Sequence, residues 1–455
     1  MAGLTDSLSR FASNPGFATL PGSASAVIKT GFTDTIATMI AGRDTEVVQI
    51  LREFVRQRQS SASEAQVLFI GEQVASNDAA LINGTAAHAL DYDDVALGGH
   101  PSTVLVPAIL AEAERLDACG ADVMRAYLVG YEIWAELSRR EPDPYHLKGW
   151  HPTAVLGTVG AAGAVAWLNR LSPEHCRHAI SLAASMACGL VANFGTMTKP
   201  LHAGRAASSA VDAVRLASAG LTAAPDAIER HAGYLAALSP KGAADLSDAV
   251  ELGERLRILE SGLSIKKYPM CYSTHRVVDG VLDLVEKHGI RPADVETVDA
   301  TIGVSQASML RNHSPATGLE AKFSLEFSVA AALISQKVGL TELTDNYVRR
   351  SDVRELMGKV RIHTSESSCP IEPVFALSDQ VTITLKDGRR LESGDIRFAR
   401  GNALLPLQDH ELKAKFLDCC ASAELDADQL YTRLNSLETL KSIRELAVFS
   451  ELTTV

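Results

Sequence analysis

The chain has 455 residues, of which 46% are hydrophobic and 22% are charged, and its formal net charge is −12. This composition is typical of a globular protein with a large core, and a chain of this length is expected to form two domains. An acidic chain without a block of Lys and Arg is not expected to bind nucleic acid. A small anionic ligand would instead need local positive charge from a few lysines or from helix N-termini.

The cysteines and the apolar segments indicate the compartment. Seven cysteines are scattered without a paired or zinc-binding spacing, which predicts reduced thiols. The N-terminus lacks a charged segment followed by an apolar run, so no secretory signal is expected. The longest apolar stretch, 153–168, is shorter than the ~18 residues of a membrane span. We therefore predict a cytoplasmic protein that does not enter a membrane.

The first part of the chain, up to about residue 260, has helical patterns almost throughout and few strand signals. Runs of Ala, Gly and Ser recur in it, and small residues let helices approach closely. We predict a compact bundle with helices over Ala24–Ala41, Ser102–Leu116, Ala121–Arg139, Thr153–Leu171, Pro173–Leu190 and Ala203–Leu221.

From about residue 264 the pattern alternates as in strands. The predicted strands are Val295–Ile302, Lys359–His363 and Val381–Leu385, and the last leads into Asp387-Gly388, a hairpin signal. Helices are predicted between these strands at Thr274–Lys287, Ala321–Ser335 and Val353–Lys359, and after them at Asp409–Ser422, Asp426–Ser436 and Thr439–Leu446.

These patterns predict a mainly α protein with two domains. Both chain ends, 1–263 and 400–455, are expected to form one large all-helical domain. The residues 264–399 are expected to form a smaller inserted α+β domain that acts as a lid.

Two histidines precede proline in similar sequences, Gly-His-Pro-Ser at 99–102 and Trp-His-Pro-Thr at 150–153. Proline is best tolerated at the first helical position, so each imidazole is expected beside free backbone N–H groups. That position attracts a carboxylate and favours a neutral imidazole, which suits a general base or a donor. We predict His100 and His151 as catalytic residues, with Ser102 and Thr153 binding substrate. The alternative is that each histidine only caps a helix.

A third helix is expected to begin near a proline, at Lys199-Pro200, and small residues follow His202. Small side chains let the backbone approach a ligand, and a lysine can pair with a substrate carboxylate or exchange protons. We predict Lys199 as catalytic and His202 as substrate-binding. The alternative is a solvated surface lysine.

The segment 265–275 lies where the helical part meets the α+β part, and domain junctions often hold small-molecule sites. Lys266 would add positive charge there, Cys271 could carry a proton as a thiolate, and Tyr272 would contact the substrate. The alternative for Cys271 is a buried and inert thiol.

Three aspartates, Asp91, Asp93 and Asp94, follow His88 closely. Such a cluster suits magnesium or calcium, which would make the protein a metal-dependent hydrolase. A full histidine–aspartate metal motif is missing, however, and a carboxylate that orients His100 or a lysine fits better. We assign this orienting role to Asp91 and expect no metal ion.

Several segments of the chain together resemble the MmgE/PrpD family, and the resemblance spans nearly the whole sequence. The family includes 2-methylcitrate dehydratase, cis-aconitate decarboxylase and iminodisuccinate epimerase. The segments are NGTAAHALDYDD at 83–94, GHPS at 99–102, GWHPT at 149–153, GTMTKPLHAG at 195–204, KKYPMCY at 266–272 and EAKFSLE at 320–326.

The resemblance implies a homodimer, joined through the helical domain, with an active site in the interdomain cleft, no Fe–S cluster and no organic cofactor. It also implies catalytic positions, which in the decarboxylase branch correspond to Asp91, His100, His151, Lys199 and Lys266. Two residues depart from that branch: Cys271 replaces a histidine, and Phe327 replaces a tyrosine. The other motifs look more like the epimerase branch.

The expected reaction is the removal or return of a proton next to a carboxylate of a small di- or tricarboxylate. Loss of a β-hydroxyl would make the protein a dehydratase-like lyase, and return of the proton on the opposite face would make it an epimerase. The alternatives are a cis-aconitate-type decarboxylase and a non-catalytic carboxylate-binding protein. In either catalytic case Lys199 and Lys266 would hold the carboxylates, and the two histidines would act as base and acid. Cys271 would be a second proton carrier.

Overall fold

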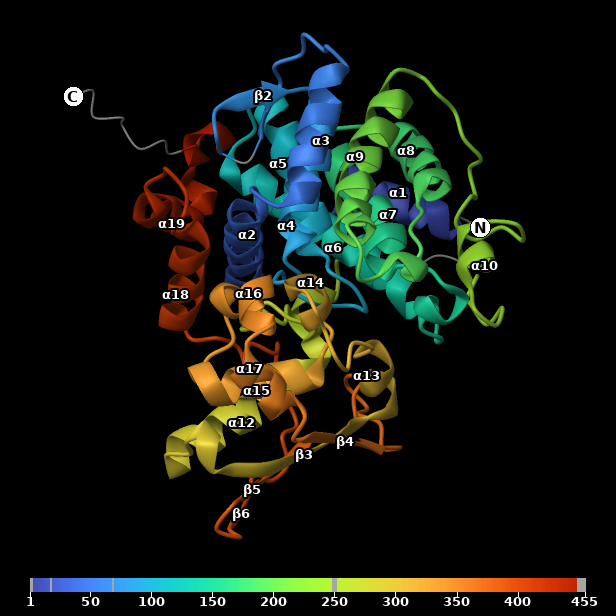
Figure 1. The fold of residues 1–455 in the computed structure, drawn as a ribbon. Helices are drawn as coiled ribbons and strands as arrows, with labels where there is room; N and C mark the ends of the chain where they lie inside the picture. Colours follow the sequence, from blue (N-terminus) through green and yellow to red (C-terminus); the bar gives the residue numbers. More distant parts are fainter. Residues whose placement is uncertain (1–2, 17–18, 68, 248–251, 448–455) are drawn as a thin grey trace, which may run out of the picture. The chain divides into compact units, whose positions relative to one another are not determined.

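The computed structural model describes residues 3–16, 19–67, 69–247 and 252–447 (Figure 1). It divides into two compact units, which are described separately. Unit 1 consists of 1–263 together with 408–455, and unit 2 consists of 264–407. Helices dominate the described residues, which confirms the predicted mainly α class.

Unit 1 is a bundle of helices with one small hairpin. The hairpin joins β1 (Ala65–Val67) to β2 (Glu72–Val74) in a region where the sequence showed no clear strand. The helices are α1 (Leu4–Ser13), α2 (Gly22–Gly42), α3 (Glu46–Gln57), α4 (Ser76–Ala89), α5 (Ser102–Leu116), α6 (Gly120–Arg139), α7 (Pro152–Leu168), α8 (Pro173–Met186), α9 (Thr198–Ser218), α10 (Tyr234–Leu238), α11 (Arg257–Ser261), α18 (Asp409–Cys420) and α19 (Ala427–Asn435).

Helix α7 lies at the centre of this bundle. All of its residues are buried, and α5, α6, α8 and α9 pack against it. A helix without a polar face must be surrounded on all sides, which is consistent with its content of Ala, Gly and Val. The start of α7, with Pro152 as its first residue, is therefore held rigidly.

Helices α4 and α9 approach each other closely at two glycines. A Cβ atom added to Gly84 would lie only 2.9 Å from the Cα of Gly204. Larger side chains would separate the two helices, since contacts below 3.0 Å require one of them to shift. This approach brings the end of α4 next to the start of α9.

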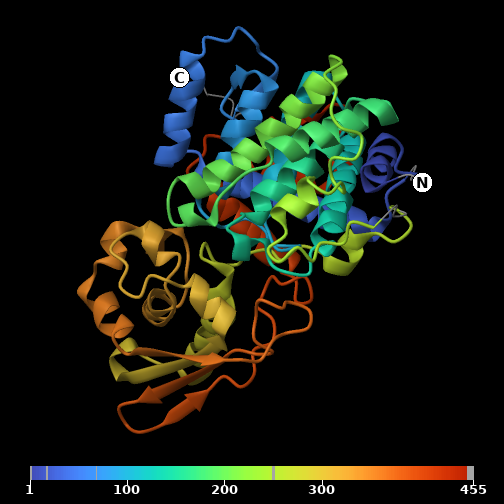
Figure 2. The same ribbon diagram turned by 90° about the vertical axis from the view of Figure 1, so that its right-hand side faces the viewer.

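Unit 2 contains a four-stranded sheet in the order β4-β3-β5-β6, with helices on one face (Figure 2). Strand β3 pairs with β4 in parallel and with β5 antiparallel, so that Val298 lies opposite both Val360 and Ile383. The predicted turn at Gly388 joins β5 to β6, and the glycine has the positive φ of +86° that such turns favour. The elements are α12 (His275–His288), β3 (Val295–Gly303), α13 (Val304–Met309), α14 (Gly318–Ala321), α15 (Leu325–Ser335), α16 (Asp345–Val348), α17 (Ser351–Met357), β4 (Val360–Ser365), β5 (Gln380–Leu385) and β6 (Arg390–Glu392).

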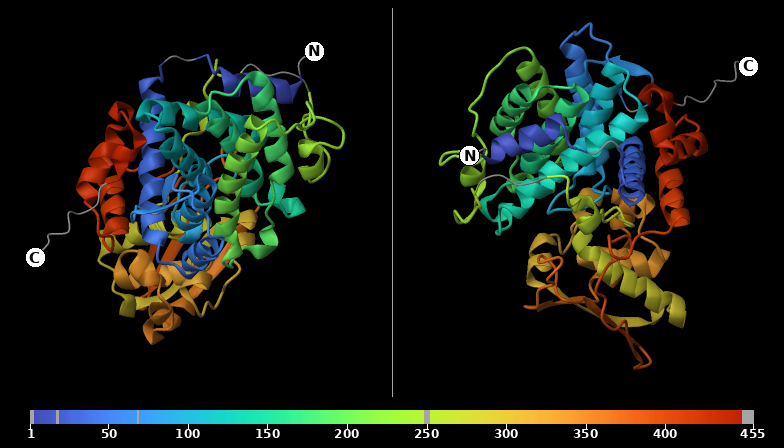
Figure 3. Two further views of the ribbon diagram at one scale, coloured as in Figure 1. Left: turned by 90° about the horizontal axis from the view of Figure 1, so that it is seen from above. Right: turned by 180° about the vertical axis from the view of Figure 1, so that it is seen from behind.

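Both ends of the chain contribute to unit 1. Helices α18 and α19 lie beside α2, as the views in Figures 1 and 3 show. The last predicted helix, over Thr439–Leu446, is instead two short 3-10 turns, Leu437–Thr439 and Ile443–Leu446.

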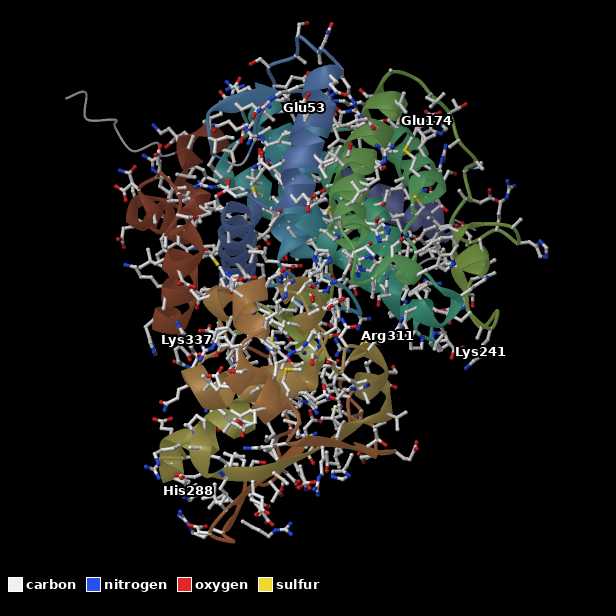
Figure 4. All side chains as sticks on the ribbon, in the orientation of Figure 1. Glu53, Glu174, Lys241, His288, Arg311 and Lys337 are labelled. Carbon is white, nitrogen blue, oxygen red and sulfur yellow. The ribbon has the colours of Figure 1, made fainter. Side chains whose placement is uncertain are left out.

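Charged side chains cover the outside of each unit. Figure 4 shows Glu53, Glu174 and Lys241 pointing outward from unit 1, and all three are exposed. Among the helices that the structure describes, none has the length and apolarity needed to span a bilayer. The charged residues that are buried are therefore the exceptions that need an explanation.

Candidate active site

Unit 1 brings together five of the predicted site residues in one buried cluster. They come from three places: the loop after α4, the start of α7 and the start of α9. The residues are Asp91, His100, His151, Lys199 and His202.

The loop after α4 turns back on that helix. Asp91 has a left-handed backbone with φ of +53°, a conformation that aspartate tolerates better than most residues. Its backbone N–H donates to the carbonyl of His88 at 3.2 Å. This reversal places the carboxylates of Asp91 and Asp93 near the His88 ring, whereas α4 alone would separate them.

Lys199 and Asp91 form a buried ion pair. The Lys199 Nζ lies 2.5 Å from the Asp91 Oδ1, and only 9% and 8% of the two side chains are exposed. The Nε2 of His100 lies 4.0 Å from the same carboxylate oxygen. The ammonium group also lies 5.5 Å from the centre of the Phe194 ring. A buried pair needs such additional partners because the charges have left water.

Asp93 binds two imidazoles. Its carboxylate lies 2.9 and 3.0 Å from the Nδ1 of His88 and 3.0 Å from the Nδ1 of His100. Burial alone would raise the pKa of Asp93, but the two histidines hold it well below its ordinary value. Burial also lowers the pKa of His88 to about 3. Asp93 is therefore a carboxylate, and His88 is a neutral imidazole that donates from Nδ1.

His151 and His202 contact each other through their Nδ1 atoms at 3.1 Å. The edge of Phe194 packs on the His151 ring, with 4.8 Å between ring centres. Burial, together with the charge of Lys199, holds the pKa of His151 well below its ordinary value. Both imidazoles are neutral near pH 7, since burial and Lys199 also lower the pKa of His202.

Ser102 and Thr153 form hydrogen bonds next to His100. The Ser102 hydroxyl donates to the Asp94 carboxylate at 2.8 Å and lies 2.6 Å from the Tyr127 hydroxyl. The Thr153 hydroxyl oxygen accepts the backbone N–H of His100 at 3.2 Å. Both side chains are fully buried, and their assignment to substrate binding stays a prediction.

The three helices that were predicted to begin at a proline differ in where they begin. His151 is the residue before α7, as predicted, and α5 begins at Ser102 just after His100. Helix α9 begins earlier than predicted, at Thr198, so Lys199 lies inside its first turn. The sequence prediction gave this helix the bounds Ala203–Leu221, with Lys199-Pro200 as its opening, but proline also fits within the first turn, where no N–H bond is lost.

The remaining predicted residues belong to unit 2. Lys266 is 1% exposed. Cys271 is also buried, and its backbone N–H donates to the carbonyl of Lys322 at 2.9 Å. The Tyr272 hydroxyl accepts from Asn402 at 3.0 Å, and burial raises the pKa of this tyrosine. Their roles in chemistry stay predictions.

Two further residues, His88 and Asp93, complete the cluster, although neither was among the predicted site residues. The signal was present in the sequence, since both lie in the segment 83–94. The carboxylate and imidazole atoms of His88, Asp91, Asp93 and His100 all lie within 4.8 Å of one another, a set that is capable of holding a metal ion. The Lys199 ammonium group already pairs with the Asp91 carboxylate, however, and a cation at this place would have to displace it.

Comparison with known proteins identifies related chains. The MmgE/PrpD N-terminal domain family matches residues 6–247, and the MmgE/PrpD C-terminal domain family matches residues 268–433. A cis-aconitate decarboxylase of Homo sapiens is 27% identical over 433 residues, which cover 92% of this chain and 88% of that protein. The mouse protein of the same name is 27% identical over 434 residues, covering 92% and 87%. A cis-aconitate decarboxylase of Aspergillus terreus is 25% identical over 331 residues, 66% of each chain.

Proposed function

The chain belongs to the MmgE/PrpD family, and from this premise we propose that it is an enzyme acting on a small di- or tricarboxylate. The proposed chemistry is the removal or delivery of a proton at a carbon next to a carboxylate. One observation carries this proposal: a buried Lys199 ammonium group lies in the same cluster as neutral imidazoles.

The chemistry needs two kinds of group, and the cluster contains both. Carbanion character next to a carboxylate is stabilised by a fixed cation in a site that excludes water, and Lys199 supplies that charge. The proton must move to or from a ring nitrogen, and the imidazoles of His100 and His151 are the candidates. Asp91 would orient the lysine through their ion pair.

Among the possible outcomes, the relatives favour decarboxylation, which the sequence prediction had placed second. In that reaction the bond to a carboxylate carbon breaks and CO2 leaves. The electron pair stays on the remaining carbon skeleton, which takes up a proton from the site next to a remaining carboxylate. For this delivery an imidazole first takes up a proton from water, and the imidazolium then transfers that proton to the carbon.

A second candidate, dehydration or epimerisation, is supported by two residues of the chain. Cys271 and Phe327 stand where the decarboxylase branch that the chain resembles has histidine and tyrosine. Replacing Cys271 by His and Phe327 by Tyr should raise the rate of CO2 release from cis-aconitate if these residues restrict the outcome. An unchanged rate would remove this support for the second candidate.

The test of the proposed function uses the purified full chain in D2O with cis-aconitate, 2-methylcitrate or iminodisuccinate, followed by NMR. CO2 release with uptake of one deuteron indicates a decarboxylase, and loss of water indicates a dehydratase. Exchange of a C–H proton without loss of either indicates an epimerase. The double variant His151→Ala with Lys199→Ala should abolish turnover in an enzyme but only weaken affinity in a binding protein. If none of the acids reacts or exchanges, the proposal is wrong.

A further inference from the structure

We propose that Asp93 is a positioning residue that holds His100 with its proton on Nδ1, so that Nε2 is the atom that exchanges a proton with the substrate. This proposal rests on the proposed function and names the base within it. It also gives a role to a buried carboxylate that the sequence prediction did not use.

The hydrogen bonds of His100 fix its tautomer. Its Nδ1 lies 2.8 Å from the backbone carbonyl oxygen of Asp94 and 3.0 Å from the Asp93 Oδ2. A carbonyl and a carboxylate can only accept, so the Nδ1 atom must carry the hydrogen. In a neutral imidazole the other nitrogen is then a bare lone pair. That nitrogen, Nε2, lies 4.0 Å from the Asp91 oxygen that pairs with Lys199.

His88 holds Asp93 in place from the other side. Its Nδ1 lies within 3.0 Å of both oxygens of the fully buried carboxylate. The other nitrogen of His88 is buried and has no hydrogen-bond partner among the described residues. The His88 ring therefore acts through its hydrogen bond to the Asp93 carboxylate, which it holds in place. The rings of His88 and His100 lie side by side, 4.5 Å apart between centres.

His151 lacks an equivalent constraint. Its Nδ1 lies 3.1 Å from the Nδ1 of His202. Either ring can donate in this pair and the other then accepts, so the contact fits two tautomeric arrangements. The acceptors around His100 allow only one. This difference identifies His100, rather than His151, as the base with a defined reacting nitrogen.

The proton balance follows from this arrangement. When Nε2 takes a proton from carbon, the C–H bond breaks and an N–H bond forms. The electron pair moves toward the adjacent substrate carboxylate, where Lys199 offers positive charge. His100 becomes an imidazolium whose Nδ1–H faces the Asp93 carboxylate, which stabilises the charge. In the reverse direction the imidazolium returns the proton and becomes neutral again.

The test combines activity with a direct measurement of the tautomer. Asp93→Asn keeps the shape of the side chain but removes its charge, and turnover should fall by roughly 10²–10⁴-fold with KM changed much less. The acid limb of the pH profile should move to lower pH by about one unit, because the imidazolium loses a neighbouring negative charge. Asp78→Asn is the matched control, since Asp78 is a buried carboxylate on helix α4 that pairs with Arg58 instead. Asp78→Asn should leave the pH profile of turnover unchanged.

The second measurement needs no variant of Asp93. In wild-type protein with 15N-labelled histidine, the His100 signals are assigned by their absence in His100→Asn. They should show a proton on Nδ1 and none on Nε2 at neutral pH. A proton on Nε2, or an acid limb that stays in place in Asp93→Asn, would overturn the proposal. If the wild-type chain turns over none of the acids, the proposed function is wrong. The tautomer measurement then still shows whether the proton of His100 lies on Nδ1, as the contacts with Asp93 and Asp94 predict.

Discussion

Two buried Lys–Asp ion pairs among the described residues of unit 1 are alike in distance and differ in surroundings. Lys199 lies 2.5 Å from Asp91, and Lys415 lies 2.6 Å from Asp34. Lys415 also donates to the backbone carbonyl of Tyr92 at 2.8 Å and lies 3.9 Å from the centre of its ring. The first pair is next to imidazoles that can take up or release protons, whereas the second is held by groups that keep their protonation state near pH 7.

The difference shows that a buried charge does not by itself identify an active site. Either pair costs desolvation and needs good partners. Of these two pairs, the pair of Lys199 also has imidazole neighbours, whose ring nitrogens can accept or donate a proton during a reaction. We therefore expect mutations of the first pair to affect chemistry and mutations of the second to affect stability.

Exchanging each lysine for methionine gives the largest expected contrast. Lys199→Met should lower turnover by about 10³-fold, because the fixed cation is lost from the site. Lys415→Met should lower the free energy of unfolding by about 3–5 kcal/mol, because it leaves Asp34 buried without its ammonium partner. Turnover per folded molecule and urea unfolding measure the two effects. Equal losses of turnover in both variants, with unchanged unfolding midpoints, would show that the two pairs do not differ as described.

Replacing single histidines tests whether an imidazole near the Lys199–Asp91 pair takes part in turnover. His151→Asn should lower turnover by about 10²-fold, since it removes an imidazole that lies among the charged groups. His178→Asn is the control, because the Nδ1 of His178 accepts the backbone N–H of Ala223 and is not part of the cluster around Lys199. Steady-state rates of the two variants, with circular dichroism to check folding, are the measurement. A control as impaired as His151→Asn would argue against a specific role.

The buried imidazoles should also make stability depend on pH. The folded pKa of His88 is about 3, whereas an unfolded histidine has a pKa near 6.5. Between these values the unfolded chain binds more protons at this site, so the free energy of unfolding falls as the pH falls. The slope is about 1.4 kcal/mol per pH unit for one such group. In His88→Gln the slope between pH 6 and 4 should be smaller by about this amount, as urea melts at several pH values would show. Equal slopes of the free energy of unfolding against pH in the wild-type protein and in His88→Gln would contradict this prediction.

The smallest expected effect is that of a chelator. Asp91 and Asp93 already have a lysine and two imidazoles as partners. We expect EDTA to leave turnover unchanged. A loss of activity that zinc or magnesium restores would instead assign His88, Asp91, Asp93 and His100 to a metal ion.

Part of this site was predictable because its signals are local. A histidine before proline marks the start of a helix, which is why His100 and His151 were placed correctly beside α5 and α7. The partnership of Asp93 with His88 was not predictable in this way. It depends on the left-handed turn at Asp91, a residue whose carboxylate pairs with Lys199 from a distant part of the chain.

The same contrast applies to the fold. The strands β3, β4 and β5 follow an alternating pattern and were predicted close to their observed bounds. Helix α4 lies in the part that was predicted to be helical almost throughout, but it was given no bounds, since it is buried on nearly all sides and lacks an amphipathic period. The strands β1 and β2 are three residues each, too short for a pattern to be recognised.

The contact between Lys415 and Tyr92 joins residues 323 positions apart in the chain. Tyr92 stands between Asp91 and Asp93, so its backbone is part of the loop that carries both carboxylates. During synthesis on the ribosome this loop emerges long before helix α18, and until then it lacks the ammonium group that anchors it. The contact between Lys415 and Tyr92 can therefore form only after residue 415 has been made, so this part of unit 1 is completed late in synthesis.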